Sequence, residues 1–243
     1  MRFLVFQHIA IEHPGIFRDF LAADGIGWDA VELDAGEKIP SFDGYDALWV
    51  MGGPMDVWEE DQHPWLAAEK RAIRAAVERG LPYMGVCLGH QLLGASLGGR
   101  VGKAAQAEVG ILDVELTAEG RRDPLFDGLR DRFKALQWHG AEVAALPAGA
   151  VVLAQSPLCK VQAMRIGSHA YGLQYHTELT PETVPQWGAV PTYACSLDQT
   201  LGQGALERLK AEAAANMADF NRDSRRLYEN FMRLSGLRRR LVA

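Results

Sequence analysis

The stretch Gly85-Val86-Cys87-Leu88-Gly89-His90-Gln91 decides how this chain folds. The apolar run 81–86 before it is typical of a strand. The apolar run 88–97 after it, stopped by two glycines, is typical of a helix. Cys87 therefore lies at a sharp turn from strand to helix. A glycine two residues to either side removes the side chains that would collide in so tight a turn. We expect the thiol to point away from the sheet edge, as a nucleophile does.

Two backbone N–H groups are expected to face this thiol. The helix that begins at Leu88 directs its free N–H groups and the positive end of its dipole at the sulfur, which favours the thiolate. An apolar strand at 47–51 ends in Gly52-Gly53-Pro54, and glycines there let the backbone approach a ligand. The N–H groups of Gly53 and Leu88 could form an oxyanion hole. A plain turn is the alternative interpretation of the two glycines.

A histidine and an acid follow a later strand, in Gly172-Leu173-Gln174-Tyr175-His176-Thr177-Glu178. Extended residues two apart point the same way, so His176 and Glu178 share one face with backbones about 7 Å apart. Glu178 could fix the tautomer of His176, which could then take the proton of Cys87. The alternatives are a half-buried histidine and a surface acid. Both segments are expected at carboxyl ends of strands, where open α/β sheets bind ligands, and this favours the catalytic interpretation.

The order of the predicted elements indicates the fold class. In the first half strands alternate with helices, whereas the middle is strand after strand, which predicts an α/β fold with a doubly wound, mostly parallel sheet and an antiparallel extension. Residues 1–243 are expected to form one domain, with a core at 1–185 and a loop and helical extension at 186–243. The loop 186–204 has no steady period and is a candidate flap. The helix at 205–234 has a possible break at 221–223. The predicted strands cover 2–7, 28–33, 47–51, 81–86, 100–102, 110–116, 133–138, 151–155, 161–166 and 170–175, and the other helices cover 16–23 and 65–79.

Composition excludes several classes of function. The net charge of -6 argues against nucleic-acid binding, and the one dense basic run, 238–240, is interpreted as a solvated tail. Three cysteines without Cys-x-x-Cys spacing predict neither a disulfide framework nor a metal site. No apolar run approaches the roughly 20 residues of a membrane span or the core of a signal peptide. We therefore expect a cytoplasmic protein.

These motifs together resemble the class I glutamine amidotransferases, and within that family the stand-alone members akin to the amidotransferase domain of GMP synthase. The three motifs stand in the family's order, and the resemblance covers residues 2–181. It implies a flavodoxin-like core and a triad of Cys87, His176 and Glu178 that cleaves the side-chain amide of glutamine. A γ-glutamyl thioester would form, with release of ammonia and then glutamate, without a cofactor. By position it also implies oxyanion N–H groups from Gly53 and Leu88, and a substrate pocket near Gly52, Gln91, Glu108 and His139.

The chain departs from the family pattern at two places. Asp56 stands where GMP synthase-type domains usually carry serine, which bears on how the pocket meets the charged end of a substrate. Nothing after Pro181 resembles an ATP pyrophosphatase domain with its phosphate loop. The resemblance therefore implies that the ammonia acceptor is a separate synthetase.

Three other functions remain open at this stage. A self-sufficient γ-glutamyl hydrolase or peptidase needs the same triad. A cysteine α/β-hydrolase is disfavoured, because that family places its acid between the nucleophile and the histidine. A non-catalytic binding module is disfavoured by the complete triad.

Overall fold

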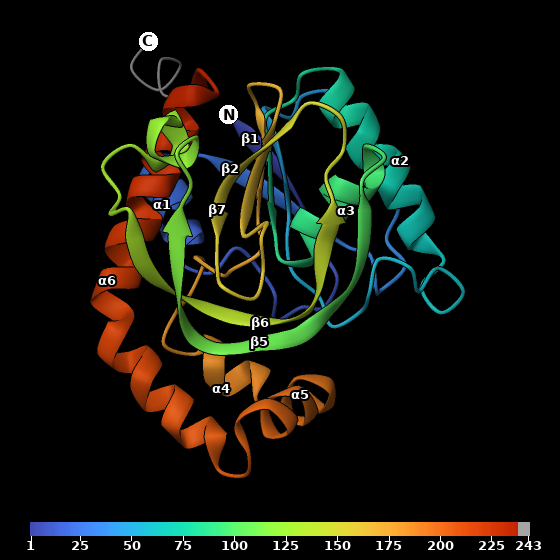
Figure 1. The fold of residues 1–243 in the computed structure, drawn as a ribbon. Helices are drawn as coiled ribbons and strands as arrows, with labels where there is room; N and C mark the ends of the chain where they lie inside the picture. The colour runs from blue at the N-terminus through green and yellow to red at the C-terminus, as the bar shows by residue number, and fades with distance from the viewer. Residues whose placement is uncertain (238–243) are drawn as a thin grey trace.

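The computed structural model describes residues 1–237, and the basic run 238–240 lies outside them. A nine-stranded sheet runs through the described part of the molecule in the order β2-β1-β3-β4-β9-β8-β7-β5-β6 (Figure 1). The strands are β1 (Arg2–Gln7), β2 (Gly27–Glu32), β3 (Ala47–Val50), β4 (Tyr83–Val86), β5 (Arg100–Leu116), β6 (Arg132–Ala145), β7 (Ala150–Gln155), β8 (Ala163–Ile166) and β9 (Ala170–Leu173).

The half of the sheet from β2 to β9 is parallel, and its strands are buried between helices. Every residue of β3 and β4 is buried, which explains their continuous apolar sequences. Helices α1 (Phe17–Ala23) and α6 (Ala205–Leu234) cover one face, and α2 (Trp65–Glu78) and α3 (Leu88–Ser96) cover the other (Figure 1). The strands from β9 through β8, β7 and β5 to β6 pair antiparallel. The predicted doubly wound sheet with an antiparallel extension is confirmed.

Strands β5 and β6 form a long, curved hairpin that extends beyond the rest of the sheet (Figure 1). The sequence predicts two separate strands at 100–102 and 110–116, and this is wrong because β5 is continuous. Its register against β6 shifts between Lys103 and Glu108. The residues in between, Ala104-Ala105-Gln106-Ala107, lack apolar alternation and fall within this register shift, so the sequence carries no local sign that the strand continues. The short 3₁₀ turns Gly120–Arg122 and Pro124–Phe126 connect the two strands.

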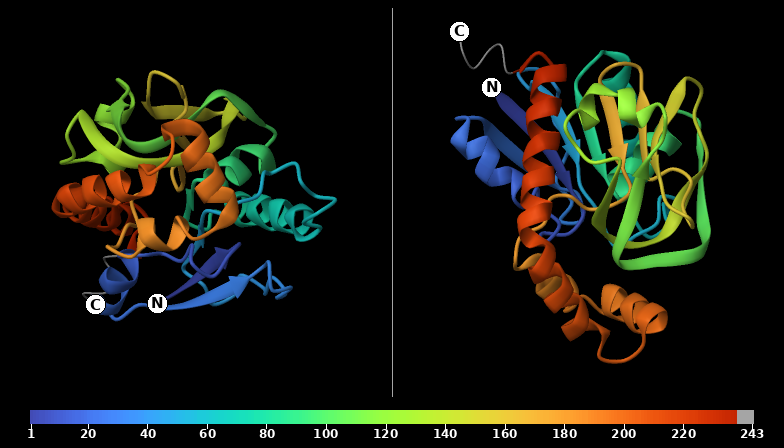
Figure 2. Two further views of the ribbon diagram at one scale, coloured as in Figure 1. Left: turned by 90° about the horizontal axis from the view of Figure 1, so that it is seen from below. Right: turned by 60° about the vertical axis from the view of Figure 1, so that its left-hand side comes forward.

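The segment after the sheet is helical rather than the expected loop. Helices α4 (Thr183–Trp187) and α5 (Pro191–Leu201) lie against the curved hairpin (Figure 2). Pro191 occupies the first turn of α5. The two buried side chains of this helix, Tyr193 and Leu197, are one helical turn apart. The long helix α6 has no break at 221–223. None of the helices in residues 1–237 is long and apolar enough to cross a membrane.

Candidate active site

The turn at Cys87 has the strained backbone that its sequence predicts. Cys87 connects β4 to α3 with φ 51° and ψ −104°, and among the described residues it is the one non-glycine residue with positive φ. A Cβ atom on Gly85 would lie 2.4 Å from Gly89 O, and one on Gly89 would lie 2.0 Å from Val50 O. Both flanking glycines are therefore required by close backbone approach. Strain of this kind is found at functional positions that the surrounding packing holds in place.

His176 and Glu178 lie beyond the end of the neighbouring strand, β9. The backbone N–H of Cys87 donates to Leu173 O at 2.8 Å, which brings the two strand ends together. His176 Nδ1 is 2.7 Å from Glu178 Oε1, so Nδ1 donates to the carboxylate and Nε2 remains for proton transfer. Trp187 of α4 packs edge-on against the His176 ring, with centroids 4.5 Å apart.

The backbone around this pair is anchored on both sides. The His176 N–H donates to Leu136 O of β6 at 2.9 Å. The hydroxyl of Ser224 on α6 donates to Thr177 O, and the Thr177 N–H donates to Glu178 Oε2 at 2.9 Å. The long helix and the curved hairpin therefore fix the positions of the histidine and the acid.

A buried histidine that sequence reasoning missed, His8, holds the Gly52-Gly53 turn through a hydrogen bond to its backbone. His8 Nδ1 donates to Gly52 O at 2.8 Å, and His8 Nε2 is 2.9 Å from Glu69 Oε1. Because a trans peptide directs its C=O and N–H in opposite directions, the Gly53 N–H points away from His8. A Cβ on Gly53 would lie 2.9 Å from the side chain of Leu88, so the two predicted oxyanion residues are adjacent.

Cys87 lines a cavity of about 190 Å³. Of the four predicted pocket residues, Gln91 and His139 line it, as do both predicted oxyanion residues. Glu108 lies behind His139, and Gly52 lies against Glu12 and His176. Asp56 also lines it, and burial together with Glu59 raises the pKa of this carboxyl. The lining residues are Gly53, Pro54, Met55, Asp56, Cys87, Leu88, Gln91, Trp138, His139, Gly140, Ala141, Thr192, Tyr193 and Ser196.

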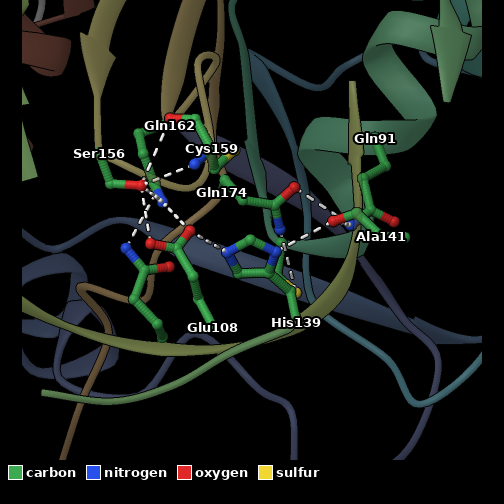
Figure 3. Close-up of polar contacts among 10 residues, drawn as sticks. Gln91, Glu108, His139, Ala141, Ser156, Cys159, Gln162 and Gln174 are labelled. Carbon is green, nitrogen blue, oxygen red and sulfur yellow. Dashed lines mark hydrogen bonds and ion pairs between the residues drawn. The ribbon is translucent and has the colours of Figure 1, made fainter. Parts of the chain in front are cut away.

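Two glutamine side chains connect the thiol to the wall of this cavity (Figure 3). Gln91 Nε2 is 3.1 Å from both Ala141 O and Gln174 Oε1, and Gln174 Nε2 is 3.6 Å from Cys87 Sγ. Sequence reasoning missed Gln174, although its place two residues before His176 in extended backbone could have indicated it.

The electrostatics of the resting thiol differ from the expectation. Burial raises the pKa of Cys87 well above its usual range, and the carboxyls of Glu12 and Glu178 raise it further. The hydrogen bond from the Leu88 N–H lowers it, but this effect is smaller. Burial therefore outweighs the effect of the helix on the pKa of Cys87, and a catalytic reaction would need a base to take its proton.

A buried acid that the sequence did not indicate closes one side of the site. Glu12 is 2 % exposed, and its Oε1 accepts a hydrogen bond from the Tyr193 hydroxyl of α5. Its Oε2 has no hydrogen-bond partner within residues 1–237. Burial raises the pKa of Glu12 well above its usual range, and the nearby Glu178 raises it further. The Glu12–Tyr193 contact attaches α5 to the loop that follows β1.

The Glu12→Gln variant is expected to gain free energy of unfolding relative to the wild type as the pH rises. A raised folded-state pKa means that the folded protein keeps a proton that the unfolded chain releases. Wild-type stability therefore falls by up to about 1.4 kcal/mol for each pH unit between the unfolded and folded pKa values. Glu12→Gln removes this loss while keeping an oxygen for Tyr193.

Urea unfolding between pH 5 and pH 8 measures the effect. The free-energy difference between Glu12→Gln and the wild type should increase with pH. The matched change at an exposed position, Glu212→Gln, should leave the pH dependence of stability unchanged. If the free-energy difference between Glu12→Gln and the wild type does not change with pH, the pKa of Glu12 is not raised in the folded protein.

Comparison with known proteins identifies the family. The sequence model described as glutamine amidotransferase class-I matches residues 22–186. The chain is 34% identical over 190 residues to the glutamine amidotransferase-like protein YfeJ of Salmonella typhimurium, covering 76% of this chain and 78% of that protein. It is 37% identical over 151 residues to the glutamine-hydrolyzing GMP synthase of Aeropyrum pernix, covering 62% of this chain and 27% of that protein.

The fold agrees with these similarities. The crystal structure of a glutamine amidotransferase from Thermotoga maritima superposes with a TM-score of 0.85 at 26% sequence identity, over 97% of this chain and 98% of that one. The chain belongs to the class I glutamine amidotransferase family.

Proposed function

We propose that this chain hydrolyses the side-chain amide of glutamine through a thioester on Cys87 and releases ammonia for a separate synthetase. The observation that carries the proposal is the strained turn at Cys87, bonded to the end of β9, and beyond that strand end a histidine whose Nδ1 is fixed by Glu178 at 2.7 Å. A thiol, a free imidazole nitrogen and an orienting carboxylate are the three parts of nucleophilic catalysis on an amide.

The first half of the reaction forms the thioester. His176 Nε2 takes the proton of Cys87 as the sulfur attacks the amide carbon, and the N–H groups of Gly53 and Leu88 stabilise the negative charge on oxygen. His176 then gives that proton to the leaving nitrogen, the C–N bond breaks, and ammonia departs. The raised pKa of Cys87 fits this sequence, because the sulfur becomes negative only when a substrate is present to accept its electrons.

The second half returns the enzyme to its starting state. His176 takes a proton from water, the resulting hydroxide attacks the thioester, and the C–S bond breaks. The sulfur recovers a proton from His176 and glutamate leaves. Asp56 on the cavity wall is a partner for the positive α-amino group of the substrate, which is a role that serine could fill only with a neutral hydrogen bond.

A γ-glutamyl amide of another amine is the second candidate substrate. Thr192, Tyr193 and Ser196 line the cavity from α5, which lies beyond the residues 22–186 that the family model matches. A segment outside the family match therefore forms part of the pocket wall. Substrate specificity can differ between family members at such a segment. Such an enzyme would be self-sufficient, whereas a glutamine-specific one would need an ammonia acceptor.

The test measures glutamate and ammonia release from L-glutamine, beside amine release from a γ-glutamyl alkylamide, with Cys87→Ala as the control. We expect Cys87-dependent turnover of glutamine. A kcat/KM at least about tenfold higher for the alkylamide would identify the second candidate instead. If neither substrate is cleaved and a γ-glutamyl chloroketone fails to label Cys87, the chain is a binding module and the proposal is wrong.

A further inference from the structure

A second group of chemically reactive side chains lies behind the wall of the cavity. Glu108 of β5, His139 of β6 and Cys159 of the β7–β8 connection are all buried, and each offers a ligand atom within 4.8 Å of the other two. Glu108 and His139 are cross-strand partners in the curved hairpin. This Glu–His–Cys group shares no residue with Cys87, His176 and Glu178.

The two ring nitrogens of His139 both face hydrogen-bond acceptors, and one of the nitrogens lacks a hydrogen bond within residues 1–237. Nδ1 is 3.0 Å from Ala141 O, and Nε2 is 3.2 Å from Glu108 Oε2 (Figure 3). Both neighbours are acceptors, so a neutral ring with one proton can satisfy only one of them. Nε2 makes no hydrogen bond of acceptable geometry within the described residues, despite its short distance to the carboxylate. A cation bound by both Nε2 and Oε2 would resolve the conflict.

The carboxylate of Glu108 is held in place as metal ligands usually are. Ser156 Oγ donates to Oε1 at 2.7 Å, and Gln162 Nε2 donates to Oε2 at 2.8 Å. Both hydrogen bonds favour the ionised carboxylate, which is the form that binds a cation. The Nδ1–H bond of His139 to a backbone carbonyl is likewise a common support for a ligating imidazole.

We propose that Glu108, His139 and Cys159 form a site for Zn²⁺ or a similar thiophilic divalent cation. One oxygen, one nitrogen and one sulfur are a ligand set that zinc accepts, and its tetrahedral bonds of about 2.0 Å separate two ligands by about 3.3 Å. The observed 3.2 Å between Nε2 and Oε2 agrees with this. Cys159 is a buried, free thiol, and its proton must leave before the sulfur can act as a ligand. Binding would form the S–Zn bond and release that proton to solvent.

The site has a route of entry and a connection to the catalytic side. Glu108 and Ser156 line a separate cavity of about 410 Å³, through which an ion and a water ligand could enter. His139 also lines the cavity of Cys87, so the cation would lie in the wall between the two. It would hold His139 and Ala141, and Ala141 O is bonded to Gln91.

Titration of the purified chain tests the site without any turnover assay, so its failure is distinguishable from failure of the proposed function. Zn²⁺ is titrated against a chromophoric chelator, and Co²⁺ is followed by the charge-transfer absorption of a cobalt–thiolate bond. We expect one equivalent of either ion and one thiolate ligand. Cys159→Ser should remove the charge-transfer band and weaken Zn²⁺ binding at least about 100-fold, and Ser156→Ala should weaken it about tenfold.

The other two cysteines supply matched controls. Cys195→Ser, at an exposed position on α5, and Cys87→Ser should both keep the band and the affinity. Binding that disappears with Cys87→Ser, or that survives Cys159→Ser, would overturn the proposal. Failure of the wild-type chain to bind either ion would also overturn it. Thermal unfolding of each variant checks that a lost site is not a lost fold.

Discussion

Cys87→Ala is expected to lower glutamine turnover by at least about 10³-fold, because Cys87 supplies the one thiol among the described residues that line the cavity. The fold should persist, since alanine fills most of the space of a small buried side chain. Stopped assays of glutamate release, at protein concentrations high enough to detect residual activity, measure the loss. Cys195→Ala, which removes an exposed thiol, should retain wild-type activity. Equal activity of Cys87→Ala and the wild type would refute the assignment of the nucleophile.

The same position makes an unusual prediction about stability. At most sites glycine is less stable than alanine by about 0.5–1 kcal/mol, because it restrains the unfolded chain less. At φ 51° and ψ −104° an alanine is strained, whereas glycine is not. Cys87→Gly should therefore equal or exceed Cys87→Ala in free energy of unfolding, while both are inactive. The usual order in urea unfolding would mean that the turn relaxes when the thiol is removed.

Gly15→Ala is expected to cost about 3 kcal/mol of stability and to reduce activity in the protein that remains folded. Gly15 has φ +50°, and an added Cβ would lie 1.5 Å from the backbone oxygen of Glu178. The neighbouring N–H of Ile16 donates to that same oxygen at 2.9 Å. The methyl group would therefore add overpacking of about 1–3 kcal/mol to a backbone cost of about 1–2 kcal/mol, and would displace Glu178.

Gly25 provides a control for the backbone cost alone. It also has positive φ, +66°, but an added Cβ would meet no atom within 4 Å. Gly25→Ala should cost about 1 kcal/mol and leave kcat unchanged. Urea unfolding and kcat per folded molecule separate the two effects. Similar losses for both variants would show that the loop before α1 does not support Glu178.

The sequence predicted the parallel half of the fold because its signals are local. Strands β3 and β4 are apolar at every position that the sheet buries, and the turn at Cys87 is marked by its glycines. The prediction divides β5 in two because residues 104–107 have no apolar alternation of their own and lie where its register against β6 shifts. Helix α5 was missed because only Tyr193 and Leu197 are buried on it, although Pro191 and the glycine after Leu201 are ordinary limits of a helix.

The candidate site divides in the same way. Cys87, His176 and Glu178 are predicted from the sequence because each belongs to a short motif at or just after a predicted strand. Glu12 and His8 come from the loop after β1, near the start of the sequence, and nothing in their neighbours indicates that they are buried near this site. Their positions depend on how β1 lies next to β3 in the sheet. Glu108 and His139 were placed near the pocket, but their contact with Cys159 depends on the hairpin register.

The long helix α6 has a consequence for how the protein is made. At one end Phe231 and Tyr228 pack on Trp49, Phe17 and Phe20, and in the middle Ser224 anchors the segment between His176 and Glu178. Because α6 follows every other described element in the sequence, it leaves the ribosome after them. Until then the aromatic face of β3 and α1 stays uncovered and available to chaperones. We expect His176 to reach its final position only after synthesis has passed α6. Chains that end before α6 would therefore release no ammonia.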